Sequence, residues 1–156
     1  MIKLINKFKN ICLKSNKLLL SKKLTLQNFG NVSQRVDSKN FVIKPSGVNL
    51  KKTKINDIVL VNIENGKKIN SKFNPSSDTE THRILYKNFP KISGIAHAHS
   101  TFLTSWSQTG KSIPNLGTTH SDHWRSFIPV TNELKKNDIK KNYKFNTGKA
   151  IIKLIK

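Results

Sequence analysis

Most histidines of the chain lie in one short stretch. Four of the five, His97, His99, His120 and His123, fall within 27 of its 156 residues. His97 and His99 stand two apart at the end of a segment, 92–99, that is expected to form a strand, and residues two apart on a strand point to the same face. Both imidazoles can therefore reach one metal cation. Two histidines that only form hydrogen bonds at a strand end are the alternative.

A carboxylate is expected close to this histidine pair. Asp78 directly precedes a segment, 79–88, that is expected to form a helix ended by Pro90, and an Asp in that position commonly caps a helix. The helix leads into the strand 92–99, so Asp78 can fold back onto the strand end. There it would be either an oxygen ligand of the metal or a carboxylate that orients a ligating histidine.

Three turns carry small polar residues suited to binding a phosphate. They are Gly30-Asn31, Ser46-Gly47 and Ser76-Ser77. Such turns present backbone N–H groups and hydroxyls to an anion. Lys44, which lies next to Pro45, would add a cation. Each turn taken alone is better explained as an ordinary turn, so the prediction depends on all three meeting in space.

A second imidazole and a carboxylate follow the sequence Gly117-Thr118-Thr119. Asp122 stands two residues after His120. A carboxylate near a metal acts as a general acid or base when its surroundings tune its pKa. Asp122 is therefore a candidate catalytic residue, and an exposed loop aspartate is the alternative.

Helical and extended segments alternate along the first half of the chain. Apolar residues three and four apart over the first 20 or so residues predict an amphipathic helix. Strands are expected at 24–33, where the chain runs into the Gly-Asn turn, at 40–44 and at 58–63. Asn65-Gly66 predicts a hairpin after the last of these strands.

The second half continues this alternation. A helix is expected at 101–108 with Gly110 beyond its end, and a short helix at 133–142. The segment 147–156 starts at a candidate N-cap, Thr147, and fits either a helix or a strand. The whole pattern predicts one layered α/β domain over residues 1–156, with antiparallel strand pairing.

The net charge of +21 suggests a polyanionic partner, but its distribution argues against one. Only three of the 29 basic residues are arginine, the side chain on which nucleic-acid recognition mostly relies. Residues 73–134 carry five basic and four acidic side chains, so +20 of the charge lies outside them. Nucleic-acid binding is therefore the less favoured interpretation, and a solvated lysine-rich surface is the preferred one.

The composition also bears on the compartment. The single cysteine, Cys12, excludes an internal disulfide and is compatible with a reducing compartment such as the cytoplasm. It falls on the apolar side of the first helix, so we expect it in the core. No apolar run approaches the roughly 20 residues that a membrane-spanning helix needs.

Seven short motifs together resemble those of one enzyme family. In the family's order and at family-like spacing, they are residues 31–33, 42–48, 75–82, 94–100, 112–114, 117–122 and 128–131. The pattern runs from about Gly30 to Gly148 and is similar to that of L-ribulose-5-phosphate 4-epimerases, in the class II aldolase family. Fuculose-phosphate and rhamnulose-phosphate aldolases typically carry Glu where Asp78 stands, and they lack the Thr-Thr-His-x-Asp segment.

The resemblance implies a fold and a set of roles. The fold is a three-layer α/β/α domain with a mostly antiparallel central sheet, assembled as a cyclic homotetramer. His97 and His99 would be zinc ligands, Asp78 would lie at or beside the zinc, and Asp122 would be a catalytic acid or base. The residues implied to line the substrate and phosphate pocket are Gly30, Asn31, Ser46, Gly47, Ser76 and Ser77.

The implied reaction is epimerisation of L-ribulose 5-phosphate at C4, which gives D-xylulose 5-phosphate. It proceeds by zinc-assisted cleavage and re-formation of the C3–C4 bond. It belongs to pentose catabolism, whether the pentulose phosphate arises from arabinose, ascorbate or another route.

Two features of the family pattern are absent from this sequence. The family has a third zinc-binding histidine on a later strand, and no histidine follows His123. The family also uses a tyrosine near the C-terminus, delivered by a neighbouring subunit, and the surroundings of Tyr143, the last tyrosine, do not match. We therefore expect the N-terminal portion of such an enzyme, with a fold incomplete at its C-terminus. A class II sugar-phosphate aldolase and an inactive remnant are the alternatives.

Overall fold

The computed structural model of the chain describes residues 2–26 and 29–155. Its elements, in order, are α1 (Ile2–Ser21), β1 (Asn31–Arg35), β2 (Asn40–Ile43), the 3-10 turn η1 (Ile55–Asp57), β3 (Val59–Asn62), β4 (Lys68–Ile69), α2 (Thr79–Asn88), β5 (Gly94–His97), α3 (Thr101–Ser107), α4 (Thr118–His123) and α5 (Lys136–Ile155).

The five strands form one sheet in the order β4-β3-β2-β1-β5, and every neighbouring pair is antiparallel. The predicted hairpin is confirmed between β3 and β4. Gly66 adopts a φ of 71°, which favours glycine, and its N–H donates to the carbonyl of Asn62 at 2.9 Å. The site is built at the opposite edge of the sheet, where β1 pairs with β5.

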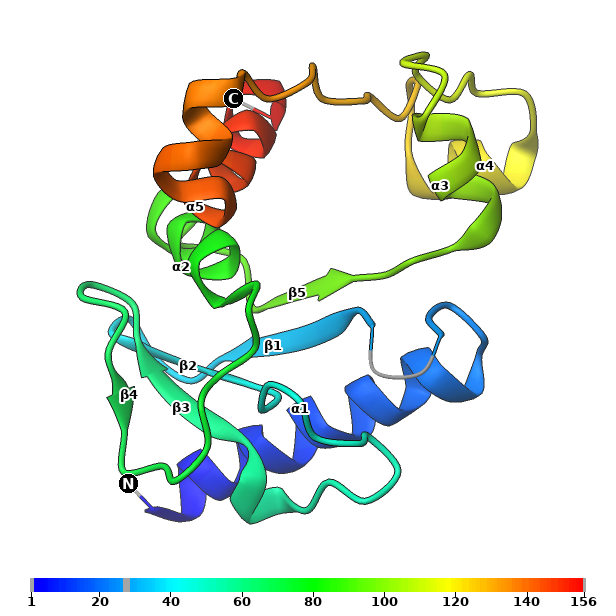
Figure 1. Ribbon diagram of the computed structural model, residues 1–156. Coiled ribbons are helices and arrows are strands. Elements are labelled where there is room, and N and C mark those ends of the chain that lie inside the picture. The colour runs from blue at the N-terminus through cyan, green and yellow to red at the C-terminus, as the bar shows by residue number, and fades with distance from the viewer. Residues whose placement is uncertain (1, 27–28, 156) are drawn as a thin grey trace.

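Both faces of the central strands are covered, because their side chains alternate between two apolar clusters. One cluster joins β2 and β3 to α1, and its buried members are Cys12, Leu13, Val36, Val42, Ile58 and Leu60. The other joins them to α2, and its buried members are Phe41, Ile43, Val59, Val61, Ile63 and Tyr86. Figure 1 shows α1 on one face of the sheet and α2, with α5 beyond it, on the other. The predicted three-layer α/β/α fold is confirmed.

The first helix packs as the sequence predicts. Cys12 is fully buried against the sheet, and burial raises the pKa of its thiol to about 12. The equally buried Asn16 ties α1 to the start of β1. Its Nδ2 donates to the carbonyl of Val32 at 2.9 Å, and its Oδ1 accepts from the N–H of Val32 at 2.8 Å. These two bonds fix the end of β1 that leads into the site.

The prediction of a first strand at 24–33 is wrong in its bounds. The strand runs from Asn31 to Arg35, and Gly30 before it adopts a φ of 70°, a turn conformation that interrupts an extended run. Leu24 to Leu26 form no strand, and residues 27 and 28 of the predicted segment lie outside the described residues. The apolar character of Leu24 and Leu26 suggested a strand, although both side chains are exposed.

The helices at the C-terminal end begin and end at other residues than predicted. The segment left open as helix or strand is helical, within α5 up to Ile155, and Lys156 lies outside the described residues. Asn142 (φ −163°, ψ 86°) interrupts α5, and its Oδ1 accepts from the N–H of Phe145 at 3.1 Å. That is the geometry of an N-cap, so Asn142 and not Thr147 caps the last helical stretch.

The helices α3 and α4 lie apart from the sheet (Figure 1). The predicted helix at 101–108 is confirmed as α3. The segment around Asp122, for which no helix or strand was predicted, forms the short helix α4. No residue between 98 and 134 is buried. Among the described residues, no helix has the length and apolar character needed to cross a membrane.

Candidate functional site

The predicted binding residues converge on one cavity of about 360 Å³. Its wall comes from the ends of β1, β2 and β5, from the turns that follow β2 and precede α2, and from α5. The lining residues are Phe29, Gly30, Asn31, Lys44, Ser46, Gly47, Ser76, Ser77, Asp78, His97, His99, Tyr143 and Lys144. All ten residues that the sequence assigned to substrate or metal are among them. Their roles stay predictions, but their meeting in space is what the prediction required.

Asp122 is not in this cavity. It is exposed on α4, in the part of the chain that lies apart from the sheet. The neighbouring His120 makes a local contact there, with Nε2 3.0 Å from the carbonyl of Ser126. The role of Asp122 as acid or base stays a prediction, and the geometry of the cavity adds nothing to it.

Asp78 is the centre of the hydrogen-bond network in the cavity. Its Oδ2 accepts from Nδ2 of Asn31 at 2.6 Å and lies 2.8 Å from Nδ1 of His97. Its Oδ1 accepts from Nζ of Lys144 at 2.5 Å. One carboxylate therefore joins β1, β5 and α5. Asp78 does stand at the N-cap position of α2, but its side chain makes no capping bond, because both oxygens are directed to these partners instead.

These partners hold the carboxyl of Asp78 in its charged form. Its pKa lies well below the usual range, first because His97 donates a hydrogen bond to it and then because Lys144 does. Burial acts in the opposite direction and is outweighed. An ionised carboxylate only accepts hydrogen bonds, so Nδ1 of His97 carries the proton in this pair.

His97 makes the hydrogen bond to a carboxylate by which metal-ligating histidines are commonly oriented. Since Nδ1 is bonded to Asp78, Nε2 is the nitrogen left to bind an ion. His99 lies beyond the end of β5, and its backbone N–H donates to the carbonyl of Leu24 at 2.9 Å. The centroids of the two imidazole rings are 4.8 Å apart. Of the two roles left open for Asp78, the structure favours the orienting carboxylate over the direct ligand.

These residues fit part of a zinc site. Two imidazoles and their carboxylate are the donor chemistry that zinc prefers. Residues 2–26 and 29–155 contain no cluster of three or more His, Cys, Asp or Glu placed to hold a metal. A catalytic zinc usually has three protein ligands, so His97 and His99 would supply two of them.

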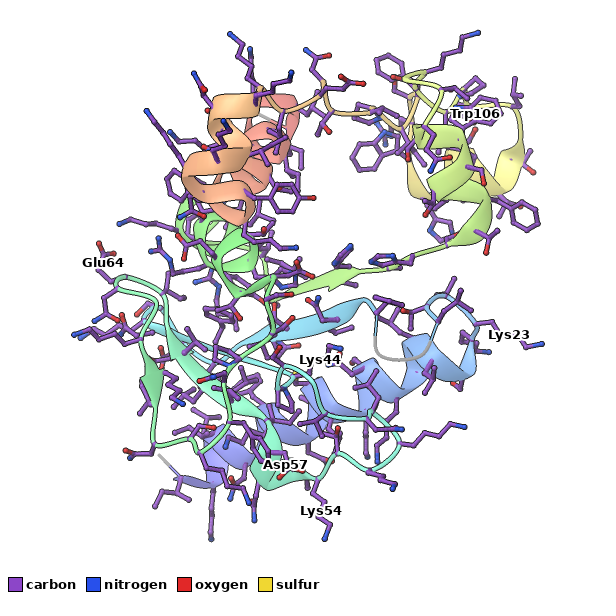
Figure 2. The ribbon with its side chains drawn as sticks, viewed as in Figure 1. Lys23, Lys44, Lys54, Asp57, Glu64 and Trp106 are labelled. Carbon is purple, nitrogen blue, oxygen red and sulfur yellow. The ribbon has the colours of Figure 1, made fainter. Side chains whose placement is uncertain are left out.

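The other end of the cavity is suited to an anion. Lys44 is only 5% exposed, and burial lowers the pKa of its ammonium, an effect that the nearby Asp78 opposes. Figure 2 shows Lys44 in the interior of the molecule, whereas Lys23 and Lys54 extend outward from its periphery. The amides of Ser46 and Ser76 already donate to the carbonyls of Asn74 and Lys44. An anion here would therefore contact hydroxyls and the ammonium more than those two amides.

Asn31, which lines the cavity, carries a buried acceptor that is unused. The residue is 2% exposed, and its Oδ1 has no hydrogen-bond partner within the part of the chain that the structure describes. A buried polar atom without a partner is costly, so such an atom commonly marks the place of a bound donor. A ligand hydroxyl is a donor of this kind.

Gly30 is required where β1 enters the site. At its φ of 70°, an added Cβ would lie 2.7 Å from the carbonyl oxygen of His97, on the neighbouring strand. Only glycine lets the backbone before Asn31 approach β5 this closely. Gly47 shares the positive φ, 71°, but no atom lies within 4 Å of an added Cβ there.

Comparison with known proteins shows to which family the chain belongs. Residues 11–153 match the profile of the class II aldolase and adducin N-terminal domain. The chain belongs to this family.

Individual members of the class II aldolase and adducin family confirm the resemblance to L-ribulose-5-phosphate 4-epimerases. A probable L-ribulose-5-phosphate 4-epimerase UlaF of Mycoplasma pneumoniae is 42% identical over 155 residues, which are 99% of this chain and 64% of that protein. The L-ribulose-5-phosphate 4-epimerase UlaF of Salmonella paratyphi B is 43% identical over 129 residues, 81% of this chain and 56% of that protein. The chain thus spans about six-tenths of the length of these relatives.

Solved structures of the class II aldolase family confirm the fold. The L-fuculose-1-phosphate aldolase of Thermus thermophilus superposes with a TM-score of 0.74 at 18% identity, over 94% of this chain and 72% of that one.

Two cavity residues on α5 were missed by the sequence analysis. Lys144 and Tyr143 reach the site because α5 packs on α2, where the hydroxyl of Thr81 donates to the carbonyl of Lys144 at 2.7 Å. Lys144 lies 66 residues after its partner Asp78. No local pattern connects the two positions, so only the tertiary fold reveals their contact.

Proposed function

We propose that the chain binds a phosphorylated sugar in this cavity, as part of an L-ribulose-5-phosphate 4-epimerase that inverts C4 to give D-xylulose 5-phosphate. The observation that carries the proposal is the meeting of a buried lysine, serine hydroxyls and a histidine pair in one cavity, with one histidine, His97, bonded to the carboxylate of Asp78. The two relatives that bear this name share 42% and 43% identity with the chain.

Some residues of the cavity would bind the phosphate, and others would orient the sugar. Lys44 would neutralise the phosphate while the hydroxyls of Ser46 and Ser77 bond to its oxygens. The unpartnered Oδ1 of Asn31 would accept from a sugar hydroxyl. A firmly held phosphate keeps the cleaved fragment in place until it rejoins from its other face, so these contacts decide between epimerisation and release.

The histidine pair would hold zinc at the other end of the sugar. His97 and His99 would be the ligands, and Asp78 would fix the tautomer of His97. A zinc ion bound there supplies a Lewis acid for the negative charge that develops on oxygen when the carbon–carbon bond breaks. Asp122 stays the proposed acid or base, and since it lies outside the cavity of its own chain, oligomerisation or a movement of α3 and α4 must bring it to the sugar. We propose a cytoplasmic homotetramer.

A product assay tests the proposal. The purified chain is supplied with zinc and L-ribulose 5-phosphate, and D-xylulose 5-phosphate is measured with a coupled enzyme. Formation of that product, lost in Lys44→Met and in His97→Ala, would support the proposal. Accumulation of glycolaldehyde phosphate and dihydroxyacetone would instead identify an aldolase, the activity named for the structural relative from Thermus thermophilus. No turnover, together with no zinc retained after dialysis, would identify an inactive remnant.

A further inference from the structure

The cavity already contains a cation of its own beside Asp78. The ammonium of Lys144 lies 2.5 Å from Oδ1 of Asp78, while Oδ2 of the same carboxylate faces His97. The side chain of Asp78 is 12% exposed and that of Lys144 is 34% exposed, so water screens this pair only in part. The imidazole of His97 and the ammonium of Lys144 thus share the two oxygens of one carboxylate.

The fold holds Lys144 in this place. Its backbone carbonyl accepts from the hydroxyl of Thr81 on α2, and Gly148, one turn later on α5, packs against Ile84. The cap at Asn142 starts the helical stretch two residues before Lys144. An ordinary surface lysine has many rotamers and no fixed partner, whereas this side chain is delivered to Asp78 by packed secondary structure.

A divalent ion on the histidine pair would share the cavity with this ammonium. Lys144, His97 and His99 line the same cavity, and the carboxylate that would offset the charge of the ion is already paired with Lys144. Like charges in one partly buried cavity repel each other, because water screens them only in part. The ammonium therefore weakens metal binding, while it leaves the histidines correctly oriented.

We propose that Lys144 sets the metal affinity of this site: its ammonium occupies the cation position beside Asp78 and opposes a divalent ion on His97 and His99. The proposal rests on the zinc-binding role given to the histidine pair under the proposed function, and it does not depend on which reaction the cavity supports. Lys144 is not a ligand here: it acts on the metal by its charge and by its ion pair with Asp78.

Zinc titration of the purified, EDTA-treated chain tests the proposal. The dissociation constant is measured by isothermal titration and by competition with a chromogenic chelator, for the unaltered chain and for Lys144→Gln, Lys144→Arg and Lys149→Gln. Lys144→Gln is expected to bind zinc about tenfold more tightly, because the repelling charge is gone. Lys144→Arg keeps the charge and should bind like the unaltered chain.

Lys149→Gln is the matched control, because it removes a charge from the same helix. The ammonium of Lys149 lies 5.0 Å from the centroid of the Phe145 ring, and Lys149 does not line the cavity. Adding His97→Ala to Lys144→Gln should abolish the tighter binding, which would locate the ion. Thermal melts by circular dichroism verify that each variant is folded.

Three results would overturn the proposal. Unchanged or weaker zinc binding by a folded Lys144→Gln chain would show that the ammonium does not oppose the metal. An equal gain in Lys149→Gln would show an effect of net charge alone. Absence of zinc binding in every variant would remove the metal role as well. Tighter zinc binding without any epimerisation would leave this inference standing and count only against the proposed function.

Discussion

At the scale of single residues, the site is organised by one carboxylate. Asp78 binds Asn31 on β1, His97 on β5 and Lys144 on α5, so three elements distant in the sequence meet at two oxygen atoms. Beneath it, the hydroxyl of Ser33 lies 2.7 Å from Nδ1 of His82. The Asn31–Asp78 and Ser33–His82 bonds are buried, whereas the bonds of Asp78 to His97 and Lys144 are buried only in part.

His82 gives the first prediction, because it is 2% exposed and must stay neutral in the fold. Burial is the main cause that lowers its pKa from 6.5 to about 4. The unfolded chain therefore takes up a proton before the folded chain does, and the folded state loses stability as the pH falls from 6.5 to 4. His82→Asn should remove this part of the pH dependence, on the order of 3 kcal/mol in the free energy of unfolding.

Urea unfolding at pH 7.5, 5.5 and 4.5 measures this effect. His123→Asn, on the exposed helix α4, controls for the loss of a histidine as such. The explanation is wrong if His82→Asn and the unaltered chain lose the same free energy of unfolding between pH 7.5 and 4.5.

The sequence motifs predicted which residues line the cavity, but they predicted less well which contacts those residues make. Ten predicted residues line it, because turns with small polar residues and a histidine pair at a strand end can be recognised in the sequence itself. Asp78 was expected to reach the histidine pair, and its Oδ2 does face His97. It was also expected to cap α2, but its side chain makes no capping bond, and no local rule predicts its bond to Lys144. Lys144 was missed because its contact depends on how α5 packs.

At the scale of secondary-structure elements, α5 supplies one side of the cavity wall, through Tyr143 and Lys144. It packs on α2 across Gly148, the buried residue of this helix. A Cβ at this position would lie 2.3 Å from Cγ2 of Ile84 and 3.3 Å from the carbonyl oxygen of Thr81. The two helices touch because glycine leaves the space for that side chain.

Gly148→Ala should therefore displace α5. We expect a loss of about 1–3 kcal/mol in the free energy of unfolding, since the added methyl group overpacks the interface, even though alanine is the better helix former. The same displacement should withdraw Lys144 from Asp78 and Tyr143 from the cavity. Chemical denaturation measures the stability, and the amide signals of Asp78 and Thr79 report the lost contact by NMR.

Gly117→Ala is the control for the added methyl group. No atom lies within 4 Å of an added Cβ at Gly117, and its φ of −155° is extended backbone that alanine adopts freely. Equal losses of stability in both variants would contradict the proposed packing role of Gly148.

The elements that the sequence predicted well are those whose burial leaves a periodic pattern. The runs that became β2 and β3 are β-branched or aromatic and covered on both faces, and α1 has one apolar side. The first strand was misplaced because Leu24 and Leu26 are apolar without being buried. The last helix was ambiguous because the contact that buries it, Gly148 against Ile84, is tertiary. Its local signal, the cap at Asn142, was not recognised in the sequence.

At the scale of the whole molecule, the chain has a buried part and an exposed part. The sheet with α1 and α2 contains both apolar clusters. The segment that carries α3 and α4, residues 101–128, contains no buried residue and exposes large apolar side chains, among them Phe102 at 87% and Leu116 at 86%. Figure 2 shows Trp106 in this segment, far from Lys44. The segment is also nearly neutral, in a chain whose net charge is +21.

This contrast predicts two levels of stability within one chain. Helices of six and seven residues have little stability of their own when nothing packs against them, so α3 and α4 should open far more readily than β2 and β3. Hydrogen exchange followed by mass spectrometry should show rapid exchange over 101–128 and slow exchange over 40–62. The exposed apolar surface should also bind the dye ANS in the folded state, and Phe102→Ser combined with Leu116→Ser should reduce that fluorescence without loss of stability.

Exchange over 101–128 as slow as over 40–62 in a dilute sample would contradict the prediction. Protection that appears only as the concentration rises would mean that another copy of the chain covers this surface.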